Sequence, residues 1–175
     1  MIAYLDSSAF VKLLLDEPHS ELAHRAWSDS ESVVASPLAY AEVAAALAAS
    51  RRSQRIRPDA YRQLLTEWDD AWDAVRGIGL TEQVVLAAGY LASTHGLSGA
   101  DAVHLASALA IGRDHVVMAV FDRRLHQAAQ AEGLATVPAT LCAAAGQGGG
   151  RLRARRVDPT SVWNATGPGG CRGPS

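Results

Sequence analysis

The sequence predicts an α/β fold with a mainly parallel central sheet, and three observations support this class. Short apolar runs typical of buried strands alternate with amphipathic segments typical of helices. The chain has 175 residues, which is enough for one domain with a substantial core. Hydrophobic residues make up 49% of the chain, so such a core can be filled. We therefore expect one folded domain in which helices connect parallel strands.

The first half of the chain begins with a strand, because residues 2–5 are apolar and Asp6 and Ser7 then stop the run. Ser7 or Ser8 is expected to cap the helix that follows at 9–15, which ends before Pro18. The remaining elements of this half are a helix at 19–28, a strand at 32–35, a helix at 37–50 after the Ser36-Pro37 signal, and a helix beginning at Pro58.

The helix that begins at Pro58 carries one apolar stripe whose members alternate spacings of four and three. These members are Tyr61, Leu65, Trp68, Trp72 and Val75. A stripe of this kind packs against a core. Two tryptophans on one stripe are also typical of a protein interface, so both interpretations stay open at this point.

The second half of the chain contains three helices and two strands. Thr81 is expected to cap a helix at 82–95 that Gly96 ends, and Asp101 is expected to begin the next helix. That helix runs to Gly112, and after it come a strand at 115–121, a helix at 123–132 and a strand at 135–137. The folded domain is therefore expected to span 1–138. Residues 139–175, rich in glycine and arginine, predict a flexible C-terminal tail.

Four carboxylates lie where a purely structural acid is hard to explain. Asp6 and Asp122 each follow an apolar strand, and ligands bind beyond the carboxyl ends of parallel strands. Asp101 lies in the first turn of its helix, where the helix dipole alone would also favour an acid. Glu42 lies in an alanine-rich helix and has no residue three or four positions away that can pair with its charge.

Glu42 is the most informative of these acids, because a buried carboxylate without a partner costs several kcal/mol or changes its pKa. Glu42 therefore either faces solvent or has a distant cationic partner, and a bound metal ion would be such a partner. If the fold gathers the four acids, they form an oxygen-only cluster suited to a hard divalent cation. Such a cluster is typical of metal-assisted phosphodiester hydrolysis.

Several neighbours of these acids are candidates for supporting roles. Ser7 either caps its helix or orients a water molecule on the metal. His104, three residues after Asp101, either has its ring satisfied within the fold or hydrogen-bonds Asp101. Three cations could offset the repulsion between an acidic pocket and phosphate, or could be ordinary surface charges: Lys12, Arg123 and Arg124.

Composition excludes several classes of protein. The net charge of −2 argues against a general nucleic-acid coat, although it permits a local basic patch. Two cysteines, Cys142 and Cys171, are too few for a metal site of their own or a disulfide scaffold. We find no basic-then-apolar leader and no segment suited to span a membrane. We therefore expect a cytoplasmic protein that does not bind membranes.

Four segments of the chain carry a resemblance to a known family: 2–8, 36–43, 97–106 and 120–125. In order and spacing they resemble the motifs of PIN-domain ribonucleases, and within that superfamily those of the VapC toxins of bacterial toxin–antitoxin modules. The likeness covers about residues 1–138. It implies a three-layer α/β/α sandwich around a mainly parallel sheet. It also implies an acidic quartet that binds Mg²⁺ or Mn²⁺, with Asp6 and Asp101 as central ligands and Glu42 and Asp122 completing the site.

The resemblance further implies an endoribonuclease that cleaves phosphodiester bonds in RNA by means of metal-activated water. On that view, four residues are candidates for substrate contacts: Ser7, Lys12, Arg123 and Arg124. A VapC-like toxin would be a homodimer and would be inhibited by a cognate VapB-like antitoxin. The third and fourth predicted helices, at 37–50 and from Pro58, with the stripe from Tyr61 to Trp72, are a candidate region for these contacts. The tail at 139–175 would either hold RNA through its phosphates or have no role.

Other functions fit the sequence less well. A haloacid-dehalogenase-like phosphatase needs a second aspartate two residues after the first, and that position is Ser8. A PIN-fold DNA nuclease of the flap type would need further elements that grip DNA. A non-catalytic PIN-like binding module would be expected to lack part of the quartet. A plain structural α/β domain would leave Glu42 unexplained.

Overall fold

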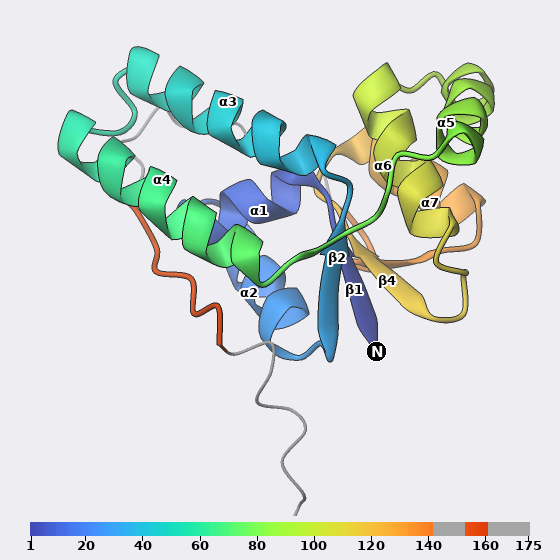
Figure 1. Ribbon diagram of the computed structural model, residues 1–175, viewed down its shortest axis with the longest axis horizontal. Coiled ribbons are helices and arrows are strands. Elements are labelled where there is room, and N and C mark those ends of the chain that lie inside the picture. The colour runs from blue at the N-terminus through green and yellow to red at the C-terminus, as the bar shows by residue number, and fades with distance from the viewer. Residues whose placement is uncertain (142–152, 161–175) are drawn as a thin grey trace, which may run out of the picture.

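The computed structural model describes residues 1–141 and 153–160, and its centre is a five-stranded parallel sheet (Figure 1). The strands are β1 (Ile2–Leu5), β2 (Ser32–Ala35), β3 (Arg76–Gly77), β4 (Val116–Ala119) and β5 (Ala135–Val137). Their order in the sheet is β3-β2-β1-β4-β5, and every neighbouring pair is parallel. The chain thus adds strands on one side of β1 and then on the other. This reversal makes the carboxyl ends of β1 and β4 a topological switch point.

Helices cover both faces of the sheet. One layer contains α1 (Ser7–Leu14), α2 (Ser20–Ser28), α3 (Leu38–Arg52) and α4 (Pro58–Asp73), and the other contains α5 (Glu82–His95), α6 (Gly99–Leu109) and α7 (Arg123–Ala131). Figure 1 shows the sheet nearly edge-on between these two layers. The predicted three-layer α/β/α sandwich is therefore confirmed. None of the helices in the described ranges is long and apolar enough to cross a bilayer.

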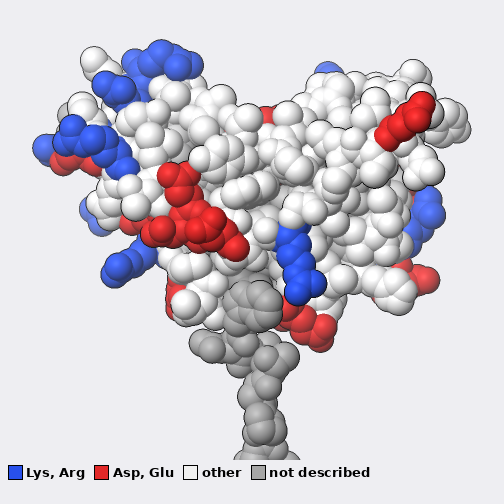
Figure 2. Space-filling view, in the orientation of Figure 1, with Lys and Arg blue, Asp and Glu red and all other residues white. Residues whose placement is uncertain are grey.

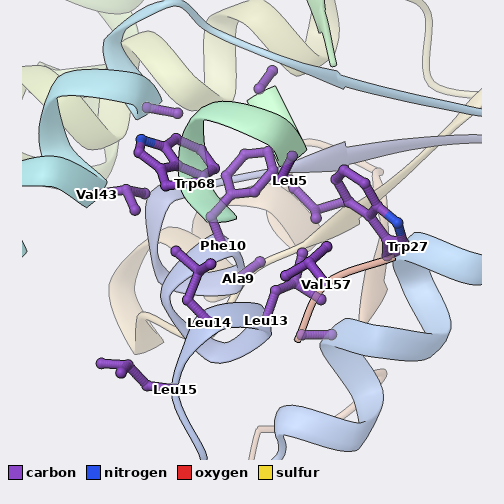
Figure 3. Close-up of a cluster of buried hydrophobic side chains, with 14 of the residues drawn as sticks. Leu5, Ala9, Phe10, Leu13, Leu14, Leu15, Trp27, Val43, Trp68 and Val157 are labelled. Atoms are coloured by element: carbon purple, nitrogen blue, oxygen red, sulfur yellow. The ribbon is translucent and has the colours of Figure 1, made fainter. Parts of the chain in front are cut away.

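The two faces of β1 pack into two separate clusters of buried side chains. Ala3 and Leu5 contribute to the cluster under α1–α4, whereas Tyr4 contributes to the cluster under α5–α7. This alternation follows from the two-residue period of a strand. In the first cluster Phe10 meets Trp68 edge-on at 5.0 Å between ring centroids (Figure 3).

The apolar stripe of α4 belongs to this first cluster. Trp68 is only 1% exposed, and the other members of the stripe pack against buried residues of the same cluster. Trp72 lies 6.2 Å from Phe10 and 5.4 Å from Trp68, measured between ring centroids. Of the two interpretations of the stripe, core packing is the one that the structure bears out.

Most element boundaries agree with the sequence expectations, and the differences have local causes. Thr81 accepts a hydrogen bond from the backbone N–H of Val84, and Gly96 ends α5 in a left-handed conformation with φ 63°, both as predicted. The cap of α1 is Asp6 rather than Ser7 or Ser8, because the Asp6 carboxylate accepts from the N–H of Ala9. Helix α6 begins two residues earlier than predicted.

Strand β3 was not predicted. It has two residues, Arg76 and Gly77, and both are exposed, so the sequence contains no apolar run that would predict a strand here. Its backbone pairs with the end of β2, and that pairing places it in the sheet. A strand of this length can be recognised only from its neighbour.

Residues 153–160, which we call the strap, lie against the α1–α4 layer. Arg155 N–H donates to the carbonyl of Leu14, and Arg153 accepts from the N–H of Asp16, each at 2.8 Å. Val157 is buried in the first cluster (Figure 3). The Trp27 indole N–H donates to the carbonyl of Asp158 at 3.0 Å. The strap therefore differs from the expectation of a flexible tail from 139 onward.

The rest of that expectation concerns residues on which the structure gives no information. Residues 142–152 and 161–175 lie outside the described ranges, and so do Cys142 and Cys171. The division of the chain into a domain at 1–138 and a tail at 139–175 stays a prediction for these residues.

Truncating Val157 to alanine is expected to lower the free energy of unfolding by about 1–2 kcal/mol, because two buried methyl groups are lost. Urea denaturation followed by tryptophan fluorescence measures this change. Arg153→Gln is the matched control, since the Arg153 side chain is exposed and its contact with the body is made by its carbonyl. The control should stay within about 0.5 kcal/mol of the wild type. Equal stability of Val157→Ala and the wild type would contradict the packing of the strap.

Candidate active site

The predicted acids surround the switch point of the sheet. Asp6 directly follows β1, and Asp122 caps α7 shortly after β4. Asp101 lies in the first turn of α6, and Glu42 lies in α3. The four residues thus come from both helical layers and from the two central strands. The order of the strands, rather than proximity in the sequence, brings them to one edge.

Two adjoining hollows open at this edge. The large hollow, of about 630 Å³, is lined by Asp101, Arg123 and Arg124 among others. The small hollow, of about 360 Å³, is lined by Ser7 and Glu42 among others. Three residues line both hollows and form the border between them: Lys12, Phe121 and Asp122. Every candidate site residue except the buried Asp6 therefore lines at least one hollow.

Asp6 is the deepest of the acids, with 4% of its surface exposed. Burial raises its pKa to about 6, and the nearby charge of Asp101 raises it further, against the opposing effects of His104, Ser8 and the Ala9 N–H. Within residues 1–141 and 153–160 no lysine, arginine or histidine forms an ion pair with Asp6. The fold therefore holds an uncompensated carboxylate at the switch point.

Ser8 positions Asp6 and was expected only as a possible helix cap. Its hydroxyl lies 2.7 Å from Oδ1 and 2.9 Å from Oδ2 of Asp6, to which it donates. The same hydroxyl accepts from the backbone N–H of Phe121 at 2.9 Å. Ser8 therefore ties the segment after β1 to the segment after β4. The position of Ser8, two residues after Asp6, was the only sequence signal for its contact with that acid. Its other partner, Phe121, is 113 residues away in the chain, so no local pattern indicates that contact.

Glu42 has distant partners within the protein, which local sequence could not supply. His104 of α6 lies 2.7 Å from Oε2 of Glu42, measured from Nε2, and the Ser7 hydroxyl donates to the same oxygen. These hydrogen bonds, with that of His104 first, lower the pKa of Glu42 against the effect of its partial burial. His104 thus contacts Glu42 rather than Asp101.

A chain of hydrogen bonds connects this network to the sheet. The Tyr4 hydroxyl accepts from the backbone N–H of Ser36 at 3.1 Å and lies 2.9 Å from Nδ1 of His104. Burial raises the pKa of Tyr4, so the phenol keeps its proton. The carboxylate of Glu42 can only accept, so Nε2 of His104 carries a proton and donates to it. Glu42 therefore stays an acceptor on the wall of the small hollow.

Asp101 and Asp122 each serve a helix end with part of their carboxylate. The Ser98 hydroxyl donates to Oδ2 of Asp101 and accepts from its backbone N–H, at 2.7 and 3.2 Å. Oδ1 of Asp122 accepts from the N–H groups of Arg124 and Leu125. In the described part of the chain, Oδ1 of Asp101 and Oδ2 of Asp122 make no hydrogen bond, so each acid keeps one oxygen for the large hollow.

The donor set fits a hard cation, although the acids do not form a closed cage. Among the described residues no group of three or more histidine, cysteine, aspartate or glutamate side chains is arranged to hold a metal ion. Mg²⁺ usually keeps several waters and needs only one or two carboxylates. Asp6, which forms no ion pair in the described part of the chain, and Asp101, whose charge raises the pKa of Asp6, are two carboxylates of this kind. The quartet as a complete ligand set stays a prediction.

Cations lie on the rim of both hollows. Lys12 Nζ is 3.2 Å from Oε2 of Glu17, and Arg55 is 3.6 Å from Oε1 of the same residue. Figure 2 shows Lys and Arg side chains gathered at the α3–α4 end of the molecule. Five arginines lie in that part of the chain: Arg51, Arg52, Arg55, Arg57 and Arg62. The local basic patch that the net charge permitted is therefore present.

The comparisons with known proteins agree with this geometry. Residues 3–131 match the family model of the PIN domain. Ribonuclease VapC45 of Mycobacterium tuberculosis (strain CDC 1551 / Oshkosh) is 48% identical over 140 residues, which are 80% of this chain and 97% of the relative. Ribonuclease VapC49 of strain ATCC 25618 / H37Rv gives the same values. Ribonuclease VapC46 of that strain is 35% identical over 134 residues, 77% of this chain and 95% of the relative.

A parallel sheet with carboxylates gathered at its switch point defines a class of protein that the family model names independently. The chain belongs to the PIN domain family and, by its relatives, to the VapC ribonucleases within it. The resemblance found in the sequence is confirmed.

Replacing Asp6 with asparagine is expected to stabilise the metal-free protein. The folded-state pKa of about 6 lies above the ordinary 3.8, so ionisation of Asp6 costs stability as the pH rises between these values. The variant should gain about 2–3 kcal/mol at pH ~8 and nothing below pH ~4. Asparagine still offers an oxygen to the Ala9 N–H, so the helix cap is kept.

Thermal unfolding in EDTA at both pH values measures this difference. Asp114→Asn removes a charge from an exposed site and serves as the matched control. A variant at position 6 that is no more stable than the wild type at the higher pH would refute the uncompensated charge.

Proposed function

We propose that this protein is a Mg²⁺- or Mn²⁺-dependent endoribonuclease and the toxin component of a type II toxin–antitoxin module. One observation carries the metal-dependent part of the proposal. Asp6 is a buried carboxylate without an ion pair among the described residues, and it lies at the switch point next to Asp101. The three relatives reported above are VapC ribonucleases, which supports RNA as the substrate.

The residues of the site divide the work between them. Asp6, held by Ser8 and the Ala9 N–H, and Asp101, held by Ser98, would bind the divalent ion. The bound ion supplies an activated water and neutralises charge on the phosphate. Because these acids are fixed by hydrogen bonds before substrate arrives, little reorganisation accompanies binding.

Glu42 and the rim cations act on the substrate side of the site. Glu42, kept ionised by His104, can accept a hydrogen bond from a water molecule in the small hollow and orient it. Ser7 holds the same carboxylate in place and lines that hollow. Three cations would offset the repulsion between the acids and the phosphates of RNA: Lys12, Arg123 and Arg124.

We also propose a cognate VapB-like antitoxin as partner, in the cytoplasm, where both would meet RNA. The open rim of the two hollows supports this proposal, because the free oxygens of Asp101 and Asp122 lie within reach of a partner's side chain. An arginine that pairs with these acids would inhibit by replacing the cation that the acids otherwise bind.

Purified protein is expected to cleave RNA in Mg²⁺ or Mn²⁺ and to lose this activity in EDTA. Asp101→Asn removes charge with little change of shape and should lower cleavage by more than about 100-fold. Asp73→Asn, on the exposed surface of α4, is the matched control and should cleave normally. A panel of structured RNAs and messenger RNA, resolved on denaturing gels, measures the activity.

Two outcomes of this experiment would contradict the proposal. Cleavage that persists in EDTA or in Asp101→Asn would place the activity elsewhere. Metal-dependent cleavage of DNA instead of RNA would favour a PIN-fold DNA nuclease, and RNA binding without cleavage would favour a non-catalytic module.

A homodimer is the assembly that the surface supports best, through α5 rather than α4. Leu86 and Tyr90 lie one helical turn apart on α5 and are 67% and 70% exposed. Val85 on the same helix and Leu80 just before it are also exposed, whereas Val84, Ala88 and Leu91 are buried. Large apolar side chains gathered on one exposed helix are typical of an interaction surface. The α4 stripe packs against the first cluster, with Trp68 buried and its other members partly buried, so it offers less exposed apolar surface than α5.

Leu86→Glu is expected to convert the dimer to a monomer, because a charge would be buried without a partner in the interface. Light scattering coupled to size-exclusion chromatography measures the mass in solution. Gln83→Glu adds the same charge to an exposed position of the same helix and should leave the dimer intact. A monomeric wild type, or a dimeric Leu86→Glu, would contradict the proposed interface.

A further inference from the structure

Phe121 lies on the border between the two hollows, and its side chain has no role in the site described above. Its side chain lines both hollows, together with Lys12 and Asp122. The side chain is partly buried and packs against the first cluster, which limits the movement of its ring. The backbone N–H of Phe121 donates to Ser8, which also holds Asp6. The ring is therefore fixed relative to the buried acid.

A second ring extends this surface. The imidazole of His19 stacks on Phe121 with 6.4 Å between centroids and an angle of 15° between planes. His19 also lines the large hollow. Because the two planes are nearly parallel, a flat group that lies against one ring is also nearly parallel to the other. We call these two rings the aromatic platform.

The backbone at His19 is unusual for a residue with a side chain. Its φ of 71° lies in the left-handed region, which glycine adopts without strain and other residues adopt at a cost. Its ring hydrogen-bonds no group in the described part of the chain, and its side chain does not cap α2. Helix geometry and hydrogen bonding therefore give no reason for a histidine here, whereas the ring stack does.

Positive charge surrounds the aromatic platform. Lys12 Nζ lies 5.3 Å from the centroid of the Phe121 ring, and Arg123 and Arg124 line the same hollow as His19. A surface that combines aromatic faces with cations is suited to single-stranded nucleic acid, because bases stack on the rings while phosphates meet the charges. Each hollow is in the size range of pockets that enclose small organic groups.

We propose that His19 and Phe121 form a stacking site for an unpaired base of the RNA substrate. The phosphate next to that base would then lie at the border of the two hollows, which Lys12 and Asp122 both line. This inference rests on the ribonuclease function proposed above. It adds that the rings of His19 and Phe121 position the RNA substrate over the acids. It selects unpaired nucleotides, because a paired base has no free face to offer.

The test compares two ligands that differ only in their bases: a short single-stranded oligoadenylate and a base-free ribose-phosphate oligomer of the same length. Full-length protein carrying Asp101→Asn, in Mg²⁺, binds them without cleavage, and fluorescence anisotropy measures affinity. Adding Phe121→Leu is expected to weaken oligoadenylate binding about 5- to 150-fold and to leave the base-free oligomer unaffected. His19→Gly, which keeps the left-handed backbone, should act in the same direction.

Two further variants separate stacking from charge and from packing. Phe121→Tyr keeps an aromatic face and should restore most of the affinity for oligoadenylate. Lys12→Gln should weaken both oligomers alike and reduce the salt dependence of binding by about one phosphate contact, whereas Phe121→Leu should leave the salt dependence unchanged. Thermal unfolding confirms that each variant is folded before its affinity is compared.

The proposal is overturned if Phe121→Leu binds oligoadenylate as well as its parent, or if it weakens both oligomers equally. Failure of the ribonuclease function itself gives a different result. In that case the wild type cleaves no RNA and the Asp101→Asn protein binds neither oligomer, and both proposals fall together. If the wild type cleaves RNA but Phe121→Leu and His19→Gly bind oligoadenylate unchanged, the stacking proposal fails and the ribonuclease proposal stands.

Discussion

The charge of Asp6 is held in a place from which water is largely excluded, and the site is arranged around that constraint. The topology alone puts a carboxylate at the end of β1, where the strand order reverses. Burial then raises its pKa, and two hydrogen-bond donors, Ser8 and the Ala9 N–H, only partly offset that effect. The same burial would strengthen the attraction between this carboxylate and the divalent cation proposed above.

The network on the other wall of the site connects all three layers. Ser36 follows β2, Tyr4 belongs to β1, His104 to α6 and Glu42 to α3, so four elements share one chain of hydrogen bonds. Each group in it has a hydrogen-bond partner, and burial keeps the phenol of Tyr4 protonated. A polar network that is satisfied in this way fixes geometry, because any shift of one member leaves a buried group without a partner. Glu42 is thereby oriented before a substrate arrives.

The strap lies beyond residues 3–131, which match the PIN family model, and still contributes a side chain to the core of the domain. Two of the relatives align over 140 residues and the third over 134, whereas this chain has 175. The strap adds Val157 to the cluster beneath α1–α4 and ties Arg155 to Asp16 at 2.8 Å. It lies against the helical layer that carries Lys12 and His19. The extra length therefore supports the elements that form one rim of the large hollow.

The sequence by itself determined the class of fold and most of its elements, and it predicted the four acids as the candidate site. Those features depend on local patterns, such as apolar runs that end in aspartate, a threonine before a helix or a glycine after one. Tertiary structure alone decided which groups meet. His104 contacts Glu42 across 62 residues and Tyr4 across 100, and Arg155 reaches Asp16 across 139. Pairings at such separations depend on the order of the strands, and no local pattern in the chain records it.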